Sequence, residues 1–517
     1  MASNDSGPGQ PPDNGRFNPK DLEKTVIALP LIEEMKRVEE NKPADGDNLL
    51  DVIVDANLDY KAGRQGAREK IGEMIGQITR KRPGEGVHVS KSKGSQQYVF
   101  ARLSPDSIRR LVRRDDEAPS RAERCIYKIW LDHAIQMFLN RSISTVKADA
   151  ARNTFGALGN TIVWAVIDSG IDGTHPHFKT HDTLDLREPL YHRDFSGLDA
   201  GGDHQTPQSD PSALVDENGH GTHVAGIIAG ESEAAPKQKR GAGARPKIEA
   251  MLSRRVDDER SEKPEIVQLD QISGVAPQAK ILSLRVFDTK GKGATSNIIA
   301  ALEYIQDRNS YGRRLLIHGV NLSVGYDFEP KWFACGQSPL CIEVNRLVRS
   351  GVVVVVAAGN TGYGAPAVMG SGPPGTGLGM SINDPGNADA AITVGSTHRD
   401  MPHIYGVSYF SSKGPTADGR DKPDLVAPGE RIVSCRSAKP NDPAPGNTAR
   451  YAEMSGTSQA APHVSGAVAA FLSIRQEFIG QPERVKEIFK GGATSLGRGS
   501  AFQGSGLLDL MRSIQSV

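Results

Sequence analysis

The 517-residue sequence lacks the features that mark several classes of protein. No apolar run approaches the about 20 residues of a transmembrane helix, so we expect no membrane partner. Lys and Arg together number 62, as do Asp and Glu, and this zero net charge gives no sign of a nucleic-acid partner. The N-terminus is polar and has no apolar stretch of a secretory signal, which predicts a cytoplasmic protein unless a leader is missing.

Cysteine is also scarce, with four residues in the chain: Cys125, Cys335, Cys341 and Cys435. No two of them form a CxxC pair, which argues against a zinc site. Cys335 and Cys341 are close enough in sequence to form a disulfide. Without a secretory signal, free buried thiols are the favoured interpretation.

The length predicts two or three domains. Residues 1–22 have a disordered composition. Residues 23–131 carry alternating strands and amphipathic helices in the order βαββαβ, which predicts a small α+β unit of the ferredoxin-like kind. Ser104 followed by Pro105 indicates a capped helix start. The expected strands are 51–58, 87–89, 98–103 and 125–131, and one helix spans 64–81.

After a linker at 132–145, residues 146–517 alternate apolar strands with small-residue helices. Strands are expected at 162–167, 280–287, 315–323 and 352–358, with a helix near 296–305. This alternation predicts an α/β domain with a doubly wound, mostly parallel sheet. Its polar strand ends would meet at one edge, where binding sites form.

Two insertions interrupt this second domain. Residues 231–271 are charged and poor in large apolar side chains, and residues 361–383 are rich in Gly, Pro and Ala. Both are predicted to be surface loops. The first is expected to be mobile and to lie on the face of the domain that carries its functional site.

Three segments carry residues suited to nucleophilic catalysis: Asp168 in VIDSGIDGTHP, His220 in NGHGTHVAGIIAG and Ser458 in SGTSQAAPHVSG. A hydroxyl nucleophile needs a base to take its proton and a carboxylate to orient that base. Each residue alone is more often a cap, a turn residue or a structural histidine. Together, in the order Asp, His, Ser, they are specific, and this order differs from those of chymotrypsin-like and α/β-hydrolase enzymes.

The segments VIDSGI, HGTHVAG, GVAP, VNLSVG, VVVAAGN, FSSKGPT, KPDLVAPG and SGTSQAAPHVSG resemble, in order, the motifs of the subtilisin-like serine proteases, the subtilase family (peptidase family S8). The resemblance covers about residues 144–517. It implies an α/β fold on a parallel sheet and an endopeptidase that works through an acyl-enzyme.

Roles for single residues follow from this resemblance. Ser458 would be the nucleophile, His220 the general base and Asp168 the residue that orients it. His223 matches a structural neighbour and is excluded. Asn360 matches the side-chain donor of the oxyanion hole, which acts together with the Ser458 N–H.

The resemblance also places two edges that pair with an extended substrate, and small residues there leave room for a peptide backbone. The walls of the pocket for the residue before the cut bond would be small, which predicts a roomy apolar pocket. The predicted substrate-binding residues are Gly291, Lys292, Gly293, Ala294, Ser323, Val324, Gly325, Ala357, Ala358 and Gly359.

Triad chemistry needs no cofactor, so any metal would be structural. Many subtilases hold calcium in a short loop after the catalytic histidine helix, and here the first insertion replaces that loop. Asp203, Asp210 and Asp216 lie nearby, but isolated loop carboxylates are mostly solvated. Structural calcium is therefore possible but weakly supported.

The N-terminal unit resembles, by element order and position, the inhibitory propeptide of many subtilases. The expected partners are thus a peptide or protein substrate and the chain's own N-terminal unit in the active-site cleft, as in a zymogen. The linker's Ile135, Met137, Phe138 and Leu139 could fill the substrate pockets. Alternatives are an accessory N-terminal domain, a silent peptide-binding homologue, or an esterase.

Overall fold

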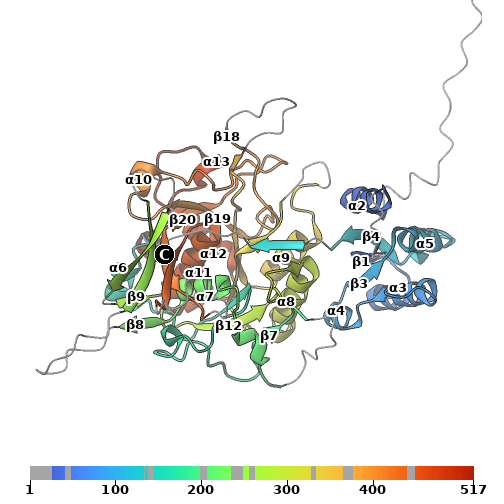
Figure 1. Cartoon of the computed structure of the whole chain (residues 1–517), viewed down its shortest axis with the longest axis horizontal. Helices are drawn as coiled ribbons and strands as arrows, with labels where there is room; N and C mark the ends of the chain where they lie inside the picture. The colour runs from blue at the N-terminus through green and yellow to red at the C-terminus, as the bar shows by residue number, and fades with distance from the viewer. Residues whose placement is uncertain are drawn as a thin grey trace, which may run out of the picture. The chain divides into compact units, whose positions relative to one another are not determined.

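The computed structural model describes residues 26–40, 48–132, 134–137, 145–197, 207–233, 248–255, 262–269, 271–327, 334–364, 376–438 and 449–517. The segment 1–22, which was predicted to be disordered, lies outside these residues. The chain divides by its internal contacts into two compact units (Figure 1). Unit 1 comprises Met1–His88 and Gln96–Leu131, and unit 2 comprises Val89–Ser95 and Asp132–Val517.

Unit 1 is an antiparallel sheet with strand order β2-β3-β1-β4 and helices packed on it. The Ser104 cap is confirmed, because its side chain accepts the Ser107 N–H at 3.3 Å. The ferredoxin-like assignment stays a prediction. The elements are α2 (Leu29–Glu40), β1 (Leu50–Ala56), α3 (Gly63–Thr79), β2 (Gly86–Val87), β3 (Tyr98–Leu103), α5 (Pro105–Asp116) and β4 (Ile126–Leu131).

Unit 2 is built on a seven-stranded sheet with order β20-β19-β16-β14-β6-β12-β7, and its pairings are parallel as predicted. Its strands are β6 (Val163–Asp168), β7 (Arg193–Asp194), β12 (Lys280–Arg285), β14 (Gly319–Leu322), β16 (Val353–Ala357), β19 (Ile392–His398) and β20 (Leu425–Glu430). Its longer helices are α7 (His220–Ile228), α8 (Thr295–Arg308), α9 (Pro339–Arg349), α11 (Thr457–Ile474) and α12 (Pro482–Gly492).

Both faces of this sheet are covered. Val353, Val355 and Ala357 belong to the apolar cluster that contains α11, whereas the buried Val354 and Val356 alternate with them along β16. Successive strand side chains point to opposite faces, so the second set faces away from α11. This explains the continuous apolar run, which is typical of a buried parallel strand.

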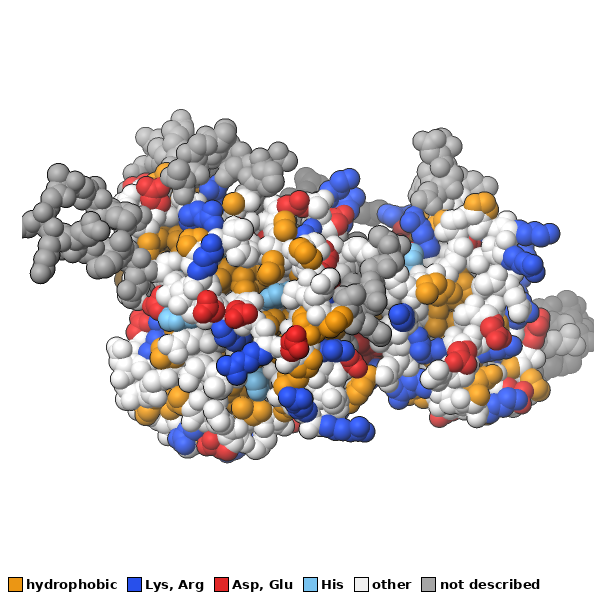
Figure 2. All heavy atoms as spheres, turned by 90° about the horizontal axis from the view of Figure 1, so that it is seen from below, with side chains coloured by type: hydrophobic (Ala, Val, Ile, Leu, Met, Phe, Trp, Pro, Cys, Tyr) orange, Lys and Arg blue, Asp and Glu red, His pale blue; other side chains and the backbone are white. Residues whose placement is uncertain are grey.

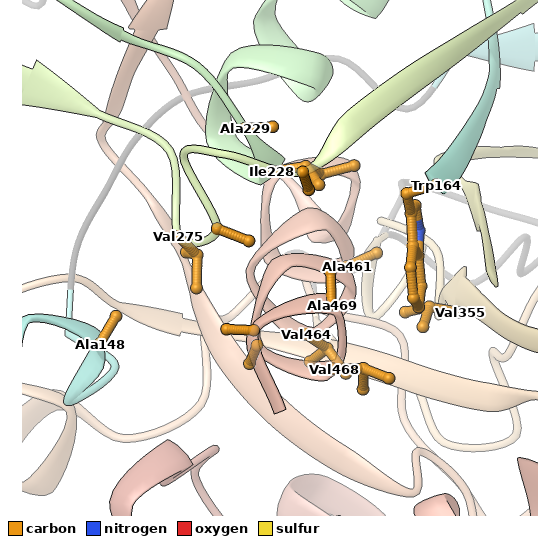
Figure 3. Close-up of a cluster of buried hydrophobic side chains, with 14 of the residues drawn as sticks. Ala148, Trp164, Ile228, Ala229, Val275, Val355, Ala461, Val464, Val468 and Ala469 are labelled. Atoms are coloured by element: carbon orange, nitrogen blue, oxygen red, sulfur yellow. The ribbon is translucent and has the colours of Figure 1, made fainter. Parts of the chain in front are cut away.

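Helix α11 runs through the core and contributes small side chains such as Ala461, Val464 and Ala469 to it (Figure 3). All but the last of its residues are buried, and it contacts β14, β16, β19, β20 and α7. A helix buried all round needs small residues where neighbouring backbones approach it closely. Ala460, Ala461, Ala467, Ala469 and Ala470 provide this along α11.

The prediction of a surface loop over 231–271 is wrong for the part of that range that the structure describes, whereas 234–247, 256–261 and 270 lie outside the described residues. Strands β9 (Ile248–Arg255) and β10 (Glu262–Leu269) pair antiparallel, and β9 also pairs parallel with β22 (Tyr451–Met454), next to β21 (Ile432–Cys435). Beside them, β8 (Glu231–Glu233) pairs with β11 (Gln271–Ser273). The strands form because Ala250 is buried and Ile248, Val267 and Leu269 pack on the core of unit 2.

The second insertion contains a short ladder, in which β17 (Tyr363–Gly364) pairs with β18 (Thr376–Gly377). Between these strands, 365–375 lies outside the described residues. The four cysteines are free and buried, as predicted. On the face drawn in Figure 2, basic and acidic side chains are interspersed, in keeping with the zero net charge.

Candidate active site

The three candidate catalytic residues stand at element ends in unit 2. Asp168 is the last residue of β6, His220 is the first residue of α7, and Ser458 is the second residue of α11. All three side chains are buried, with at most 1% of each residue exposed. The carboxyl end of a parallel strand and the starts of two helices therefore supply the parts that the sequence predicted.

Asp168 and His220 form a close pair. The His220 Nδ1 lies 2.8 Å from Asp168 Oδ1 and 3.0 Å from Oδ2. The Ser169 N–H also donates to Asp168 Oδ1 at 2.7 Å. A carboxylate at Nδ1 favours the tautomer with its proton there, which leaves Nε2 as the acceptor of a neutral imidazole.

Ser458 is held by reciprocal hydrogen bonds to Ser323. The Ser458 hydroxyl donates to the Ser323 carbonyl at 3.0 Å, and the Ser323 hydroxyl donates to the Ser458 carbonyl at 2.8 Å. Ser323 in turn accepts a hydrogen bond from the Asn321 amide at 2.8 Å, and Asn321 accepts one from Ser465 at 2.9 Å. This buried chain of hydrogen bonds ties the start of α11 to the end of β14.

Asn360 is oriented by Thr457. Its Oδ1 accepts the Thr457 N–H at 2.9 Å and the Thr457 hydroxyl at 3.1 Å. Because the amide oxygen is engaged there, the Nδ2 donor points to the other side of the amide. The preceding Gly359 has φ 109°, and a Cβ there would stand 2.3 Å from Asn383 Oδ1, so glycine is required beside this donor.

The two predicted substrate edges lie on either side of a segment of the same chain. Strand β5 (Ala134–Met137) pairs antiparallel with β13 (Gly293–Ala294) on one side and with β15 (Val324–Gly325) on the other. Ile135 lies opposite Gly293, and Met137 lies opposite Val324. The predicted pocket-filling residues Phe138 and Leu139 lie outside the described residues.

The remaining predicted substrate residues flank these strands. Gly291 turns with φ 73°, and its N–H donates to Asp288 O at 3.0 Å, while the Lys292 N–H donates to Asp288 Oδ1 at 2.8 Å. Ala357 ends β16, and Ala358 follows it fully buried. The roomy apolar pocket expected for the substrate residue before the cut bond stays a prediction.

Asp132, two residues before β5, is fixed to the start of α8. Its carboxylate accepts the Ser296 N–H at 2.9 Å and the Ser296 hydroxyl. Lys91, from α4 (Val89–Gly94), donates to the Ser296 hydroxyl at 3.0 Å and lies 3.7 Å from the Asp132 carboxylate. An acidic group is favourable at the positive end of a helix dipole, so this contact anchors the entry to β5.

The sequence interpretation missed the part that Asp216 plays. Isolated loop carboxylates were expected to be solvated, yet Asp216 is buried and accepts the Gly219 N–H at 2.7 Å and the Thr222 N–H at 2.8 Å. It also accepts the Thr222 and Ser169 hydroxyls at 2.6 and 2.9 Å. Burial raises the pKa of Asp216, although these bonds oppose the rise. The available signal was an acidic residue four positions before α7, whose first N–H groups have no partner within the helix; here it also bonds the residue after Asp168.

His223 lies inside the core. Its Nε2 stands 3.0 Å from the Ile432 carbonyl and 3.2 Å from the Ala452 carbonyl. Burial lowers the pKa of His223 to about 3, so it is neutral at physiological pH. These contacts join α7 to β21 and β22 and fit the structural part expected for it.

No group of three or more His, Cys, Asp or Glu side chains suited to a metal ion occurs among the described residues. Asp210 instead accepts the Asp194 N–H at 3.0 Å, and Asp203 lies outside the described residues. The possible structural calcium stays a prediction. Of the helices that the structure describes, none is long and apolar enough to span a membrane.

Comparison with known proteins identifies the family. The model of the subtilase family matches residues 159–506. Serine protease AprX of Bacillus subtilis (strain 168) is 28% identical over 381 residues, which is 71% of this chain and 69% of that protein. Pyrolysin of Pyrococcus furiosus is 31% identical over 310 residues, which is 54% of this chain but only 19% of pyrolysin.

A solved structure supports the same fold. Fervidolysin from Fervidobacterium pennivorans, described as a keratinolytic enzyme related to subtilisin, matches with a TM-score of 0.55 at 19% identity. The match covers 95% of this chain and 62% of that one, so this chain spans less than two thirds of fervidolysin. The family model covers most of unit 2, including all three candidate catalytic residues. This chain therefore belongs to the subtilase family and is a subtilisin-like serine endopeptidase.

Proposed function

We propose that Ser458, His220 and Asp168 hydrolyse peptide bonds through an acyl-enzyme. The observation that carries this proposal is the buried pair of His220 Nδ1 and Asp168, at 2.8 Å, together with the candidate nucleophile Ser458 in the first turn of α11. The pair leaves Nε2 free of its proton and therefore basic. The Ser458 hydroxyl has one proton, so it releases the Ser323 carbonyl when it donates to His220.

The steps then follow. Ser458 Oγ attacks the carbonyl carbon of the substrate, and His220 takes the hydroxyl proton while Asp168 stabilises the imidazolium. The oxyanion accepts hydrogen bonds from Asn360 Nδ2 and the Ser458 N–H. The C–N bond breaks, and the amine leaves with the proton from His220. A water molecule, deprotonated by His220, then attacks the ester carbonyl; the bond from Ser458 Oγ to the acyl carbon breaks, His220 returns the proton to Oγ, and the acid leaves.

The test is hydrolysis of fluorogenic peptides by Ser458→Ala, His220→Ala and Asp168→Asn. Each is expected to lower turnover by about 10⁴-fold or more without changing the circular dichroism spectrum. Ser473→Ala, a second buried serine on α11, is the matched control and should retain activity. If Ser458→Ala kept more than about a thousandth of wild-type turnover, another nucleophile would be at work.

We also propose that β5 inhibits the enzyme until the chain is cut. Its antiparallel register between β13 and β15 is the arrangement that an extended substrate would adopt. Met137, the last residue of β5, pairs with Val324. The residue before Val324 is Ser323, whose carbonyl accepts the hydrogen bond of the Ser458 hydroxyl, so the end of β5 lies close to the candidate nucleophile. A tethered strand has a high effective concentration, so it competes strongly with substrate. Unit 1 would then be an inhibitory propeptide, and the cut would fall within a few residues after Met137.

Masses of wild type and Ser458→Ala, purified side by side, test this. Wild type is expected to be shortened by a cut after Met137 and Ser458→Ala to stay whole. Asp132→Asn, which weakens the anchor on Ser296, should speed the appearance of activity, whereas the exposed Asp149→Asn should not. A wild-type chain that stays full length and is fully active would disprove the inhibitory part.

A further inference from the structure

Four large apolar side chains stand exposed together near Asn360. Tyr363, Met380, Tyr409 and Phe502 have 49%, 56%, 68% and 46% of their surface exposed, and we name this group the aromatic shelf. The rings of Tyr363 and Tyr409 pack edge to face, with centroids 5.7 Å apart. They come from three separate segments of unit 2, so tertiary structure and not sequence proximity gathers them.

A buried lysine holds the shelf in place. Lys413 is only 7% exposed, and its ammonium donates to the Gly362 carbonyl at 2.8 Å and the Tyr409 carbonyl at 3.0 Å. The same ammonium lies 5.7 Å from the ring centre of Phe502. One cation therefore fixes the backbone beside Tyr363, the backbone of Tyr409 and the ring of Phe502. Next to it, the Met380 N–H donates to the Gly414 carbonyl.

The shelf is continuous with the candidate active site. The Ser412 N–H donates to the Gly359 carbonyl at 2.9 Å, and the Gly362 N–H donates to the Phe410 carbonyl at 2.9 Å. The hydroxyl of Thr361 donates to Asn383 Oδ1 at 2.8 Å. Tyr363 follows Asn360 by three residues, so their Cα atoms are at most about 11 Å apart. An extended peptide covers that span with three or four residues.

Exposed aromatic side chains that are held rigidly are typical of binding surfaces. Tyrosine offers a large contact area and loses little conformational entropy on binding, because it has only two side-chain torsions. Here the stacking and the lysine have already fixed the rings, so further ordering costs less. Continuity with Asn360 indicates the occupant, because a polypeptide in the active site would extend from there.

We propose that the aromatic shelf binds apolar or aromatic side chains of an extended polypeptide substrate, three or more residues from the bond that is cut. This inference rests on the proposed function. The shelf makes the enzyme prefer unfolded, apolar-rich chains over short peptides, because only a long chain reaches the shelf and the strands β13 and β15 at once.

The test compares two substrates, namely fluorescein-labelled β-casein, which is unfolded, and a tetrapeptide amide with a small fluorogenic leaving group. In the double variant Tyr363→Ser, Tyr409→Ser, kcat/KM for casein is expected to fall about tenfold, mainly through KM. The tetrapeptide value should stay within twofold. The matched control is Ile404→Ser with Tyr405→Ser, a pair exposed by 65% and 64% on α10 (Pro402–Tyr405), which should change neither value.

Binding to the Ser458→Ala protein, cut after Met137 by an added protease so that β5 can leave β13 and β15, separates this inference from the catalytic one. Fluorescence anisotropy of labelled casein should show a Kd about tenfold higher when the shelf pair is replaced, whether or not the wild type hydrolyses anything. If the wild type cleaves neither substrate, the proposed function is disproved, but the Kd for casein still tests whether the aromatic shelf binds polypeptide. Unchanged casein binding, an equal effect of the control pair, or a parallel fall in the tetrapeptide rate would overturn the shelf.

Discussion

Units 1 and 2 build their cores from different side chains. Unit 1 packs large residues such as Ile71, Met74 and Leu111 between its sheet and helices. In unit 2, the buried apolar residues of α11 itself are mostly alanine and valine, so helix and strands approach closely, while larger residues such as Trp164 and Phe489 fill the rest of the core. Close approach is what lets Ser323 and Ser458 exchange backbone hydrogen bonds. In unit 2, small side chains thus place the catalytic groups, whereas unit 1 needs only to bury apolar surface.

The largest expected effect comes from enlarging a small residue in unit 2. A Cβ on Gly466 of α11 would meet Val275 Cβ at 2.6 Å and the Ile228 carbonyl at 3.2 Å. Gly466→Leu should therefore lower the free energy of unfolding by about 4 kcal/mol or more and abolish activity. Urea unfolding followed by tryptophan fluorescence measures the loss.

Gly491 on α12 is the matched control, because a Cβ there meets nothing within 4 Å. Gly491→Leu should leave stability within about 0.5 kcal/mol of wild type. Equal losses in the two variants would show that the tight packing around α11 is not what limits side-chain size.

The next effect comes from removing volume in unit 1. Ile71 is fully buried on α3, and Ile71→Ala should destabilise unit 1 by about 2–5 kcal/mol through lost burial and a cavity. Hydrogen exchange with mass spectrometry should show faster exchange in β1 and α3 but not in α11. The exposed Leu58→Ala is the control. Faster exchange in α11 as well would mean that the two units unfold together.

The same contrast explains what the sequence could predict. Strand β6 ending at Asp168 and helix α11 opening near Ser458 were visible, because apolar runs and small-residue motifs are local signals. That these residues lie together in the folded protein could be predicted only from the family resemblance, because no local sequence pattern indicates that His220 contacts Asp168. Similarly, β5 was expected to be able to fill the substrate site, but its pairing with β13 and β15 is a tertiary fact.

Strands β9 and β10 show where secondary structure cannot be predicted from local sequence patterns. Their alternating pattern is short, and Pro264 weakens the signal for a strand. Proline is tolerated there because β10 is the edge of its sheet, and β9 gains a partner in β22, far along the chain. Asp216 was misread for a related reason, because its donors Gly219 and Thr222 face it only once α7 has formed.

The smallest expected effect is a pH dependence in unit 2, where six of the described histidines are buried and burial lowers the pKa of four of them to about 3 or 4. Burial lowers the pKa of His175 and His463 to about 4 and that of His177 and His223 to about 3. Unfolded histidine has a pKa of about 6.5, so the unfolded state binds more protons between that pH and the folded values. Stability should therefore fall as the pH drops below about 6.5 and continue to fall toward pH 4.

One histidine can be isolated in this effect. His463 on α11 has its Nδ1 2.8 Å from the Gln459 carbonyl, and His463→Leu removes its titration without touching the candidate triad. Between pH 6.5 and 5.5, wild type should lose up to about 1.4 kcal/mol more stability than this variant, the value of one pKa unit. Urea midpoints at the two pH values measure the difference, and the exposed His403→Leu should preserve the wild-type loss. Equal losses of stability in wild type and His463→Leu would show that His463 does not oppose folding in acid. The core around α11 would then be no barrier to protonation of this side chain.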